Sequence, residues 1–253
     1  MIDTLLKLTG LPLQDLLIAA LAVLTAGLIR GFAGFGLSAI LMASIVTIIP
    51  PVSLIPICFI LEGLAGVIMF KGGIRHADMT LVWGLSIGSA IGAPIGLYAT
   101  TSIDVDLSKL IALMVILSLT TALLFKFRPK FLATRPGLYG SGLTAGVVSG
   151  LASVGGMVVA LYILASEPEV KKIRASLVMY LFIGMFTSLI YLFVYDMMTM
   201  QAFWRAAVFS PIVLLGVFLG GLLFRPAYEH LYKRVCLLLL VGLCVLGLAR
   251  QIL

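Results

Sequence analysis

The stretch LTAGLIRGFAGFG (residues 24–36) decides the fold, because a close copy of it occurs later in the chain as LTAGVVSGLASVG (residues 143–155). The two stretches match at seven of thirteen positions, without a gap, at a constant offset of 119 residues. Further on, GAPIG (residues 92–96) in the first half falls opposite GVFLG (residues 216–220) in the second. Such similarity between two stretches of one chain is typical of an internal duplication. We therefore expect two repeats, residues 1–130 and 131–253.

Composition places the whole chain in a membrane. Of 253 residues, 62% are hydrophobic and 11% charged, and the mean hydropathy is +1.23. These values are far from those of a soluble domain. The net charge of +7 comes from basic residues in short loops between apolar runs, so it indicates membrane topology rather than nucleic-acid binding. No residue pattern predicts a metal site or another cofactor.

Six apolar runs are long enough to cross a bilayer. Roughly 20 helical residues span a ~30 Å hydrocarbon core. Three such runs fall in each repeat, and the last is the shortest. The predicted spans are residues 52–70, 81–100, 108–125, 175–194, 204–223 and 235–249.

Two further apolar regions, residues 16–49 and 137–166, are interrupted by glycine. Arms of roughly 10 to 16 residues would reach only ~15–24 Å, so we expect each region to form a re-entrant helical hairpin. The predicted fold is an all-α integral membrane protein of two repeats, each with one hairpin and three transmembrane helices. Five full spans per repeat would give the same parity, and only the length of the arms favours hairpins.

An odd number of spans per repeat makes the two repeats inverted relative to one another, a common plan of secondary transporters. The basic residues agree with this topology. If both hairpins return to their side of entry, twelve basic residues lie on one side and four on the other, which places both termini outside the cytoplasm. The four are Lys7, Lys109, Arg205 and Arg250, and the twelve are Lys71, Arg75, Lys126, Arg128, Lys130, Arg135, Lys171, Lys172, Arg174, Arg225, Lys233 and Arg234.

The interrupted hairpin tips predict an anion site. Irregular backbone survives at membrane depth only where it faces protein or a water-filled cavity. The second arm of each hairpin begins at the tip, near Leu37 and Met157, so its helix N-terminus with its unpaired N–H groups points into that cavity. Glycines allow the turns and a close approach to a ligand. The glycines concerned are Gly31, Gly34, Gly36, Gly150, Gly155 and Gly156.

Arg30 and Glu62 are the charged residues that lie clearly inside apolar segments. A guanidinium there needs a partner, and it offers several donors to an oxyanion. Arg30 is therefore a candidate substrate ligand. The alternative is that it pairs with Glu62 and holds the first repeat together. Glu62 is in turn a candidate proton-coupling group, or only the partner of Arg30.

Hydroxyl groups complete the predicted anion site. Ser149 stands in the second repeat where the first has Arg30, and Ser153 follows one turn later. Both could donate hydrogen bonds to the same anion, although serine in membrane helices is often only a small packing residue. We include Ser38, in the second arm of the first hairpin, among the substrate-binding candidates.

At these residues the chain resembles the TauE/SafE family of sulfite exporters, which is grouped with 4-toluenesulfonate uptake permeases. The resemblance rests on the duplicated elements GLIRGFAGFG (residues 27–36) and GVVSGLASVGG (residues 146–156), and on a length near 250 residues. It implies proton-linked transport of sulfite or small organosulfonates across a bacterial inner membrane. In the second repeat Ser153 and Val154 depart from the glycine-rich pattern.

The leading hypothesis is a secondary-active anion transporter that works by alternating access. A channel-like anion conduit is the nearest alternative. A non-transporting membrane partner subunit would leave Arg30 and the tips without a purpose, and a membrane-embedded enzyme would need more reactive groups at depth. We do not expect an enzyme. A homodimer stays open, since small-residue faces such as GSAIGAPIG (residues 88–96) pack helices within or between protomers.

Overall fold

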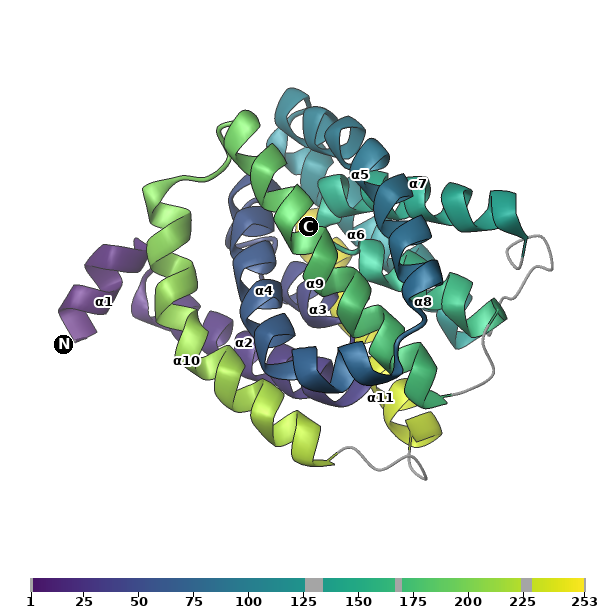
Figure 1. Ribbon diagram of the computed structural model, residues 1–253. Helices are drawn as coiled ribbons and strands as arrows, with labels where there is room; N and C mark the ends of the chain where they lie inside the picture. The colour runs from purple at the N-terminus through teal and green to yellow at the C-terminus, as the bar shows by residue number, and fades with distance from the viewer. Residues whose placement is uncertain (1, 126–133, 167–169, 224–228, 253) are drawn as a thin grey trace.

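The computed structural model describes residues 2–125, 134–166, 170–223 and 229–252, and every regular element in these ranges is a helix (Figure 1). A short first helix precedes two similar series of five. The helices are α1 (Ile2–Thr9), α2 (Leu13–Ala33), α3 (Leu37–Ile45), α4 (Pro51–His76), α5 (Met79–Ser102), α6 (Val105–Leu124), α7 (Arg135–Ala152), α8 (Gly155–Ser166), α9 (Val170–Val194), α10 (Met200–Leu223) and α11 (Glu229–Ile252).

Among the described residues, six helices are long and apolar enough to cross a membrane: α2, α4, α5, α6, α9 and α10. Five of them contain or nearly match predicted spans. The sixth is α2, which we did not predict as a span. The predicted span 235–249 is not among the six, because its described apolar part, Leu237–Ala249, is shorter than 18 residues. The chain is a multi-pass membrane protein.

The predicted hairpin arms were wrong in one respect, because the arms are unequal. The first arms, α2 and α7, have 21 and 18 residues, whereas the second arms, α3 and α8, have 9 and 12. At ~1.5 Å per residue, α2 is as long as a bilayer core is thick. The reason is that α2 already begins at Leu13, directly after Pro12, and that each break falls just past the middle of its apolar run.

Left-handed backbone ends the first arm of each hairpin. In the first, Gly34 (φ 82°) closes α2 by donating its N–H to the carbonyl of Arg30, and Gly36 (φ 96°) precedes α3. In the second, Ser153 adopts φ 56° and closes α7 through the carbonyl of Ser149. A Cβ atom disfavours this conformation by roughly 1–2 kcal/mol, so the second tip is strained where the first uses glycine.

Glycine faces hold each first arm against a long helix of the other half. On α5, Gly88 lies beside Gly142 of α7, and Gly96 lies beside Gly150, so these two helices run in the same direction. A Cβ atom added at any of these positions would overlap the backbone of the facing helix. Such small-residue faces let membrane helices pack backbone to backbone. The face at residues 88–96 is thus used within the chain.

The partner arrangement in the other half has the same form. Gly216 and Gly220 of α10 pack against Leu24, Gly27 and Leu28 of α2, again with the helices parallel. At the centre, α4 and α9 run antiparallel, with Gly63 beside Met185. The contacts of α6 with α11, α4 with α10 and α5 with α9 complete a set in which each pairing has a counterpart in the other half.

The N-terminal helix α1 lies at one end of the bundle beside α10 (Figure 1). There the buried guanidinium of Arg205 donates from Nε to the carbonyl oxygen of Thr9 at 2.7 Å. This contact satisfies the last carbonyl of α1 with a charged donor. Arg205 therefore has a structural role remote from the hairpin tips.

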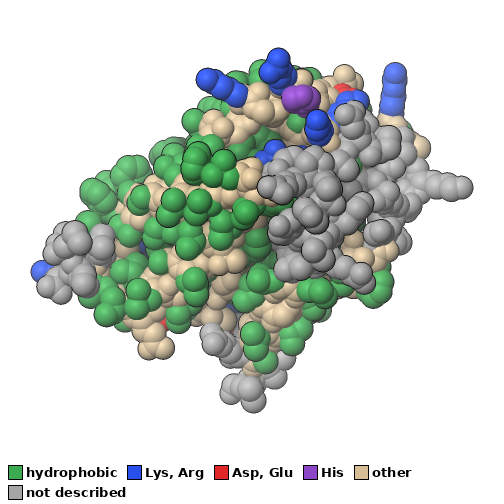
Figure 2. Space-filling view, turned by 90° about the horizontal axis from the view of Figure 1, so that it is seen from below, with side chains coloured by type: hydrophobic (Ala, Val, Ile, Leu, Met, Phe, Trp, Pro, Cys, Tyr) green, Lys and Arg blue, Asp and Glu red, His purple; other side chains and the backbone are tan. Residues whose placement is uncertain are grey.

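The surface agrees with a membrane location. In Figure 2 hydrophobic side chains are spread over the part of the face that is not grey, and most of the visible basic side chains, with one histidine, gather at one edge. The described basic residues exposed at the end of α4 and the start of α9 include Lys71, Arg75 and Lys171, beside His76. His76 is the last residue of α4. The side chain of His230 lies outside the described residues.

Candidate functional site: a cavity between two hairpin tips

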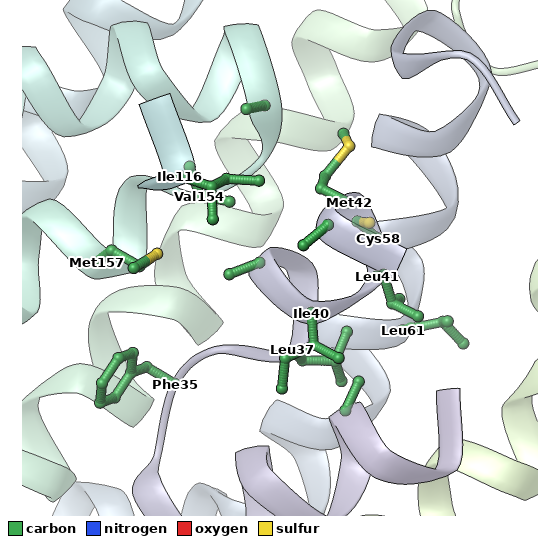
Figure 3. Packing of buried hydrophobic residues seen from close by; sticks show 14 of the residues in the cluster. Phe35, Leu37, Ile40, Leu41, Met42, Cys58, Leu61, Ile116, Val154 and Met157 are labelled. Atoms are coloured by element: carbon green, nitrogen blue, oxygen red, sulfur yellow. The ribbon is translucent and has the colours of Figure 1, made fainter. Parts of the chain in front are cut away.

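The tips of the two hairpins meet around one small cavity. In Figure 3, Phe35 and Leu37 of the first tip lie in the same apolar core as Val154 and Met157 of the second. The cavity between them is small, with a volume of ≈ 10 Å³, about enough for one water molecule. It is lined by Gly36, Ser38, Ala39, Glu62, Ser153, Val154, Gly156, Met157 and Leu181. The polar groups of this wall come from α3, α4 and the second tip, and the rest is apolar.

Glu62 in this wall forms an ion pair with Arg30, which lies behind it. Nε of Arg30, whose side chain is 0% exposed, is 2.8 Å from Oε2 of Glu62, although the two are out of line for a hydrogen bond. Nη1 of Arg30 donates to the carbonyl of Gly34, and Nη2 has no hydrogen-bond partner among the described residues. Arg30 thus both pairs with Glu62 and fastens the turn that ends α2. The charge of Arg30 is compensated by Glu62, but its Nη2 group can still donate hydrogen bonds.

The other oxygen of Glu62 is bound at the start of α3. Oε1 accepts from the hydroxyl of Ser38 at 3.1 Å and from the backbone N–H of Ser38 at 3.4 Å. Ser38 lies in the first turn of α3, where N–H groups lack partners within the helix. A carboxylate is favourable at this position, because the helix dipole and the unpaired N–H groups attract negative charge.

The second tip carries hydroxyl groups in place of the ion pair. The hydroxyl of Ser153 is buried at the cavity and has no hydrogen-bond partner among the described residues. Deeper in the helix packing, Tyr180 donates to Ser89 at 3.0 Å, and Ser149 is within hydrogen-bonding reach of the same phenol. At the offset of 119 residues, Leu181 stands where the first half has Glu62.

The candidate residues separate into two groups. Gly36, Ser38, Glu62, Ser153 and Gly156 line the cavity. The others surround it: Arg30 lies behind Glu62, Gly31 packs against α10, Gly34 contacts Arg174, Gly150 packs against α5, and Gly155 closes against Ser149. Gly31 and Gly150 therefore serve contacts between helices.

A larger, basic vestibule opens beside the end of α2. It has a volume of ≈ 450 Å³ and is bordered by Gly31, His76, Lys171 and Arg174 together with apolar residues of α4, α9 and α10. Arg174 donates from Nε to the carbonyl of Phe32 at 3.0 Å and from Nη2 to that of Gly31 at 2.6 Å. Its side chain therefore separates the vestibule from the first tip.

Sequence reasoning missed Arg174 and Tyr180. Arg174 lies in the basic run KKIR (residues 171–174). Such a run is typical of a topology determinant, and the pattern does not single out one of its residues. Tyr180 looks like one more apolar residue of a span. A phenol in the middle of a membrane helix needs a hydrogen-bond partner, and this was the available signal.

We predict that Arg174→Ala destabilises the first tip. The substitution removes the donors that satisfy two carbonyl groups at the end of α2, and such charge-assisted hydrogen bonds are worth about 1.5–3 kcal/mol each. The expected result is a lower midpoint of thermal unfolding in detergent. Lys171→Ala, which removes an exposed charge from the same vestibule, should leave the midpoint nearly unchanged. Equal midpoints for both variants would contradict the capping role.

Comparison with known proteins identifies the family. The fold and the buried ion pair between α2 and α4 define a multi-pass membrane protein with polar groups held at depth. The family model described as "Sulfite exporter TauE/SafE" matches residues 19–247, so the chain belongs to this transporter family. No curated protein and no solved structure matches the chain.

Proposed function

We propose that this protein is a secondary-active transporter that moves sulfite or a small organosulfonate across the cell inner membrane. The observation that carries the proposal is the cavity at which both hairpin tips meet, with Ser38, Glu62 and Ser153 in its wall and Arg30 directly behind. A sulfite or sulfonate group presents three oxygen atoms that accept hydrogen bonds. The partly unused guanidinium, the hydroxyl groups and two helix N-termini are suitable donors for it.

The arrangement of the helices supports alternating access between two inverted halves. The first arm of each hairpin packs on a helix of the other half, and α4 crosses α9 antiparallel at the centre. Each tip is therefore held by a helix of the other half. Rocking of the pair α2 and α10 against the pair α5 and α7 would open the cavity to one side at a time. The basic vestibule at Arg174 would be its approach from the cytoplasmic side, where positively charged residues gather.

Glu62 is the group through which a proton would be coupled to the anion. Its carboxylate neutralises Arg30, so an anion that binds Arg30 leaves Glu62 without its counter-ion. Protonation of Glu62 would restore the balance, since the site would then hold one cation and one anion. Buried charges are strongly unfavourable unless they are paired. Anion and proton would therefore move together.

Transport in proteoliposomes tests this proposal and separates it from a conduit. Purified protein is reconstituted, and uptake of radiolabelled sulfite is followed with and without an imposed pH gradient at equal sulfite concentration inside and outside. A proton-linked transporter accumulates sulfite above the outside concentration, whereas a conduit brings the two concentrations to equality and responds only to the membrane potential. Absence of any uptake would contradict both.

We predict that Ser153→Gly has opposite effects on stability and on binding. Glycine relieves the left-handed backbone strain, which is worth about 1 kcal/mol, and so should raise the midpoint of thermal unfolding. It also removes the unpaired hydroxyl from the cavity, which should weaken sulfite binding about fivefold, as expected for one hydrogen bond. Titration of both proteins with sulfite measures the second effect.

Ser118→Gly on α6 is the comparison for Ser153→Gly, because Ser118 is exposed and helical. It should lower the midpoint and leave sulfite binding unchanged. If Ser153→Gly instead binds sulfite as the wild type does, its hydroxyl is not a substrate ligand.

A further inference from the structure

The anion position at the first tip is already filled by the protein itself. The carboxylate of Glu62 has Oε2 beside Arg30 Nε at 2.8 Å and Oε1 in contact with the hydroxyl and N–H of Ser38. A guanidinium and the first turn of a helix are the groups that recognise an external oxyanion. The side chain of Glu62 is 6% exposed, so nearly all of its surface is in contact with protein.

The second tip provides the contrast. Its helix α8 also begins at the cavity, but the position that corresponds to Glu62 is Leu181, which packs against Gly156. The hydroxyl of Ser153 there is buried without a partner among the described residues. One tip thus holds an internal carboxylate, and the facing tip offers a vacant donor across a small cavity.

A substrate anion in this cavity would meet the carboxylate before it met the guanidinium. Arg30 is not part of the cavity wall, whereas Glu62 is. With Glu62 charged and in place, a second anion would be repelled by it and would be screened from Arg30. Two like charges in a poorly solvated site are strongly unfavourable.

We propose that the Glu62 carboxylate is a tethered competitor, which occupies the substrate position at Arg30 and Ser38 until an external oxyanion displaces it. The inference rests on the proposed function, because it takes the cavity to be the substrate site. The inference adds that, when no substrate is bound, the Glu62 carboxylate keeps Arg30 paired. Affinity is then set by the exchange of one carboxylate for one sulfite or sulfonate group at the same donors.

The test is the dissociation constant of sulfite for Glu62→Gln, measured on the full chain in detergent by isothermal titration calorimetry at one pH and ionic strength. Glutamine keeps the size of the side chain and removes its charge, so sulfite should bind at least about tenfold more tightly than to the wild type. Asp106→Asn is the matched control, since it removes an exposed carboxylate that also forms an ion pair, with Lys109. Its dissociation constant should equal that of the wild type.

The outcomes separate the two proposals. Unchanged or weaker sulfite binding by a folded Glu62→Gln protein overturns the competitor, while the proposed function survives. If sulfite binds neither the wild type nor the variant, the proposed function fails as well. If Glu62→Gln does not fold, infrared difference spectra of the wild type and of Asp106→Asn decide. Saturating sulfite should shift the same carboxylate stretching band in both proteins. If sulfite at saturation changes no carboxylate band, the inference is overturned.

Discussion

Replacing Arg30 by alanine should abolish sulfite uptake in proteoliposomes. The substitution removes the buried cation at the first tip, with its contacts to Glu62 and to the carbonyl of Gly34. An unpaired carboxylate then remains beside the cavity and repels the substrate. Truncating one partner of a buried, hydrogen-bonded charge pair in a binding site costs about 2–5 kcal/mol of binding free energy, which corresponds to a decrease of at least about thirtyfold in uptake at low sulfite concentration.

The matched control for this prediction is Arg205→Ala. Arg205 is also buried and also donates to a backbone carbonyl, that of Thr9, but it lies at the contact of α1 with α10. Its loss should lower thermal stability and leave the uptake per folded molecule unchanged. Folding of each variant is checked by size-exclusion chromatography before reconstitution. Wild-type uptake by folded Arg30→Ala would assign Arg30 to a purely structural role as the partner of Glu62.

Replacing Gly146 by valine should prevent the protein from folding. Gly146 lies on the face of α7 that packs against α5, and a Cβ atom there would overlap the backbone carbonyl of Ser89. Backbone cannot move aside as a flexible side chain can, so α5 and α7 would have to separate. Overpacking of this kind costs about 1–3 kcal/mol in soluble cores, and more is expected where the obstacle is the main chain.

Gly140→Val on the same helix is the control for Gly146→Val. A Cβ atom at Gly140 would meet nothing within 4 Å. This variant should purify as a single peak with a midpoint of unfolding close to that of the wild type, whereas Gly146→Val should give aggregated or degraded protein. Equal yields and midpoints for both would contradict the close packing of α5 and α7.

Much of this fold could be predicted from the sequence, because apolar run length and glycine interruptions depend on local physics. Five predicted spans and both interruptions lie where the structure has them. The unequal arms were not predicted, since α2 begins at Leu13, before the predicted region 16–49, and α3 already ends at Ile45. The small helix α1 was missed because its anchor, Arg205, lies on α10.

The site was predicted less completely than the fold. Charge at membrane depth led to Arg30 and Glu62, and the structure has them as an ion pair. Whether a candidate lines the cavity depends on the packing of α3 against α4 and of one tip against the other, and sequence spacing does not contain this information. Gly31 and Gly150 share the glycine pattern with Gly36, yet they pack between helices, whereas Gly36 lines the cavity, as Gly156 does.

The most direct test of the central claim, that the cavity between the tips binds the substrate anion, is thermal unfolding of the purified protein against sulfite, methanesulfonate, acetate and phosphate at equal ionic strength. The comparison is the double variant Arg30→Gln/Glu62→Gln, which removes both charges and keeps the site neutral. We expect sulfite or methanesulfonate to raise the wild-type midpoint selectively and to leave the double variant unchanged. A midpoint that no anion raises, or an equal rise in both proteins, would contradict the claim.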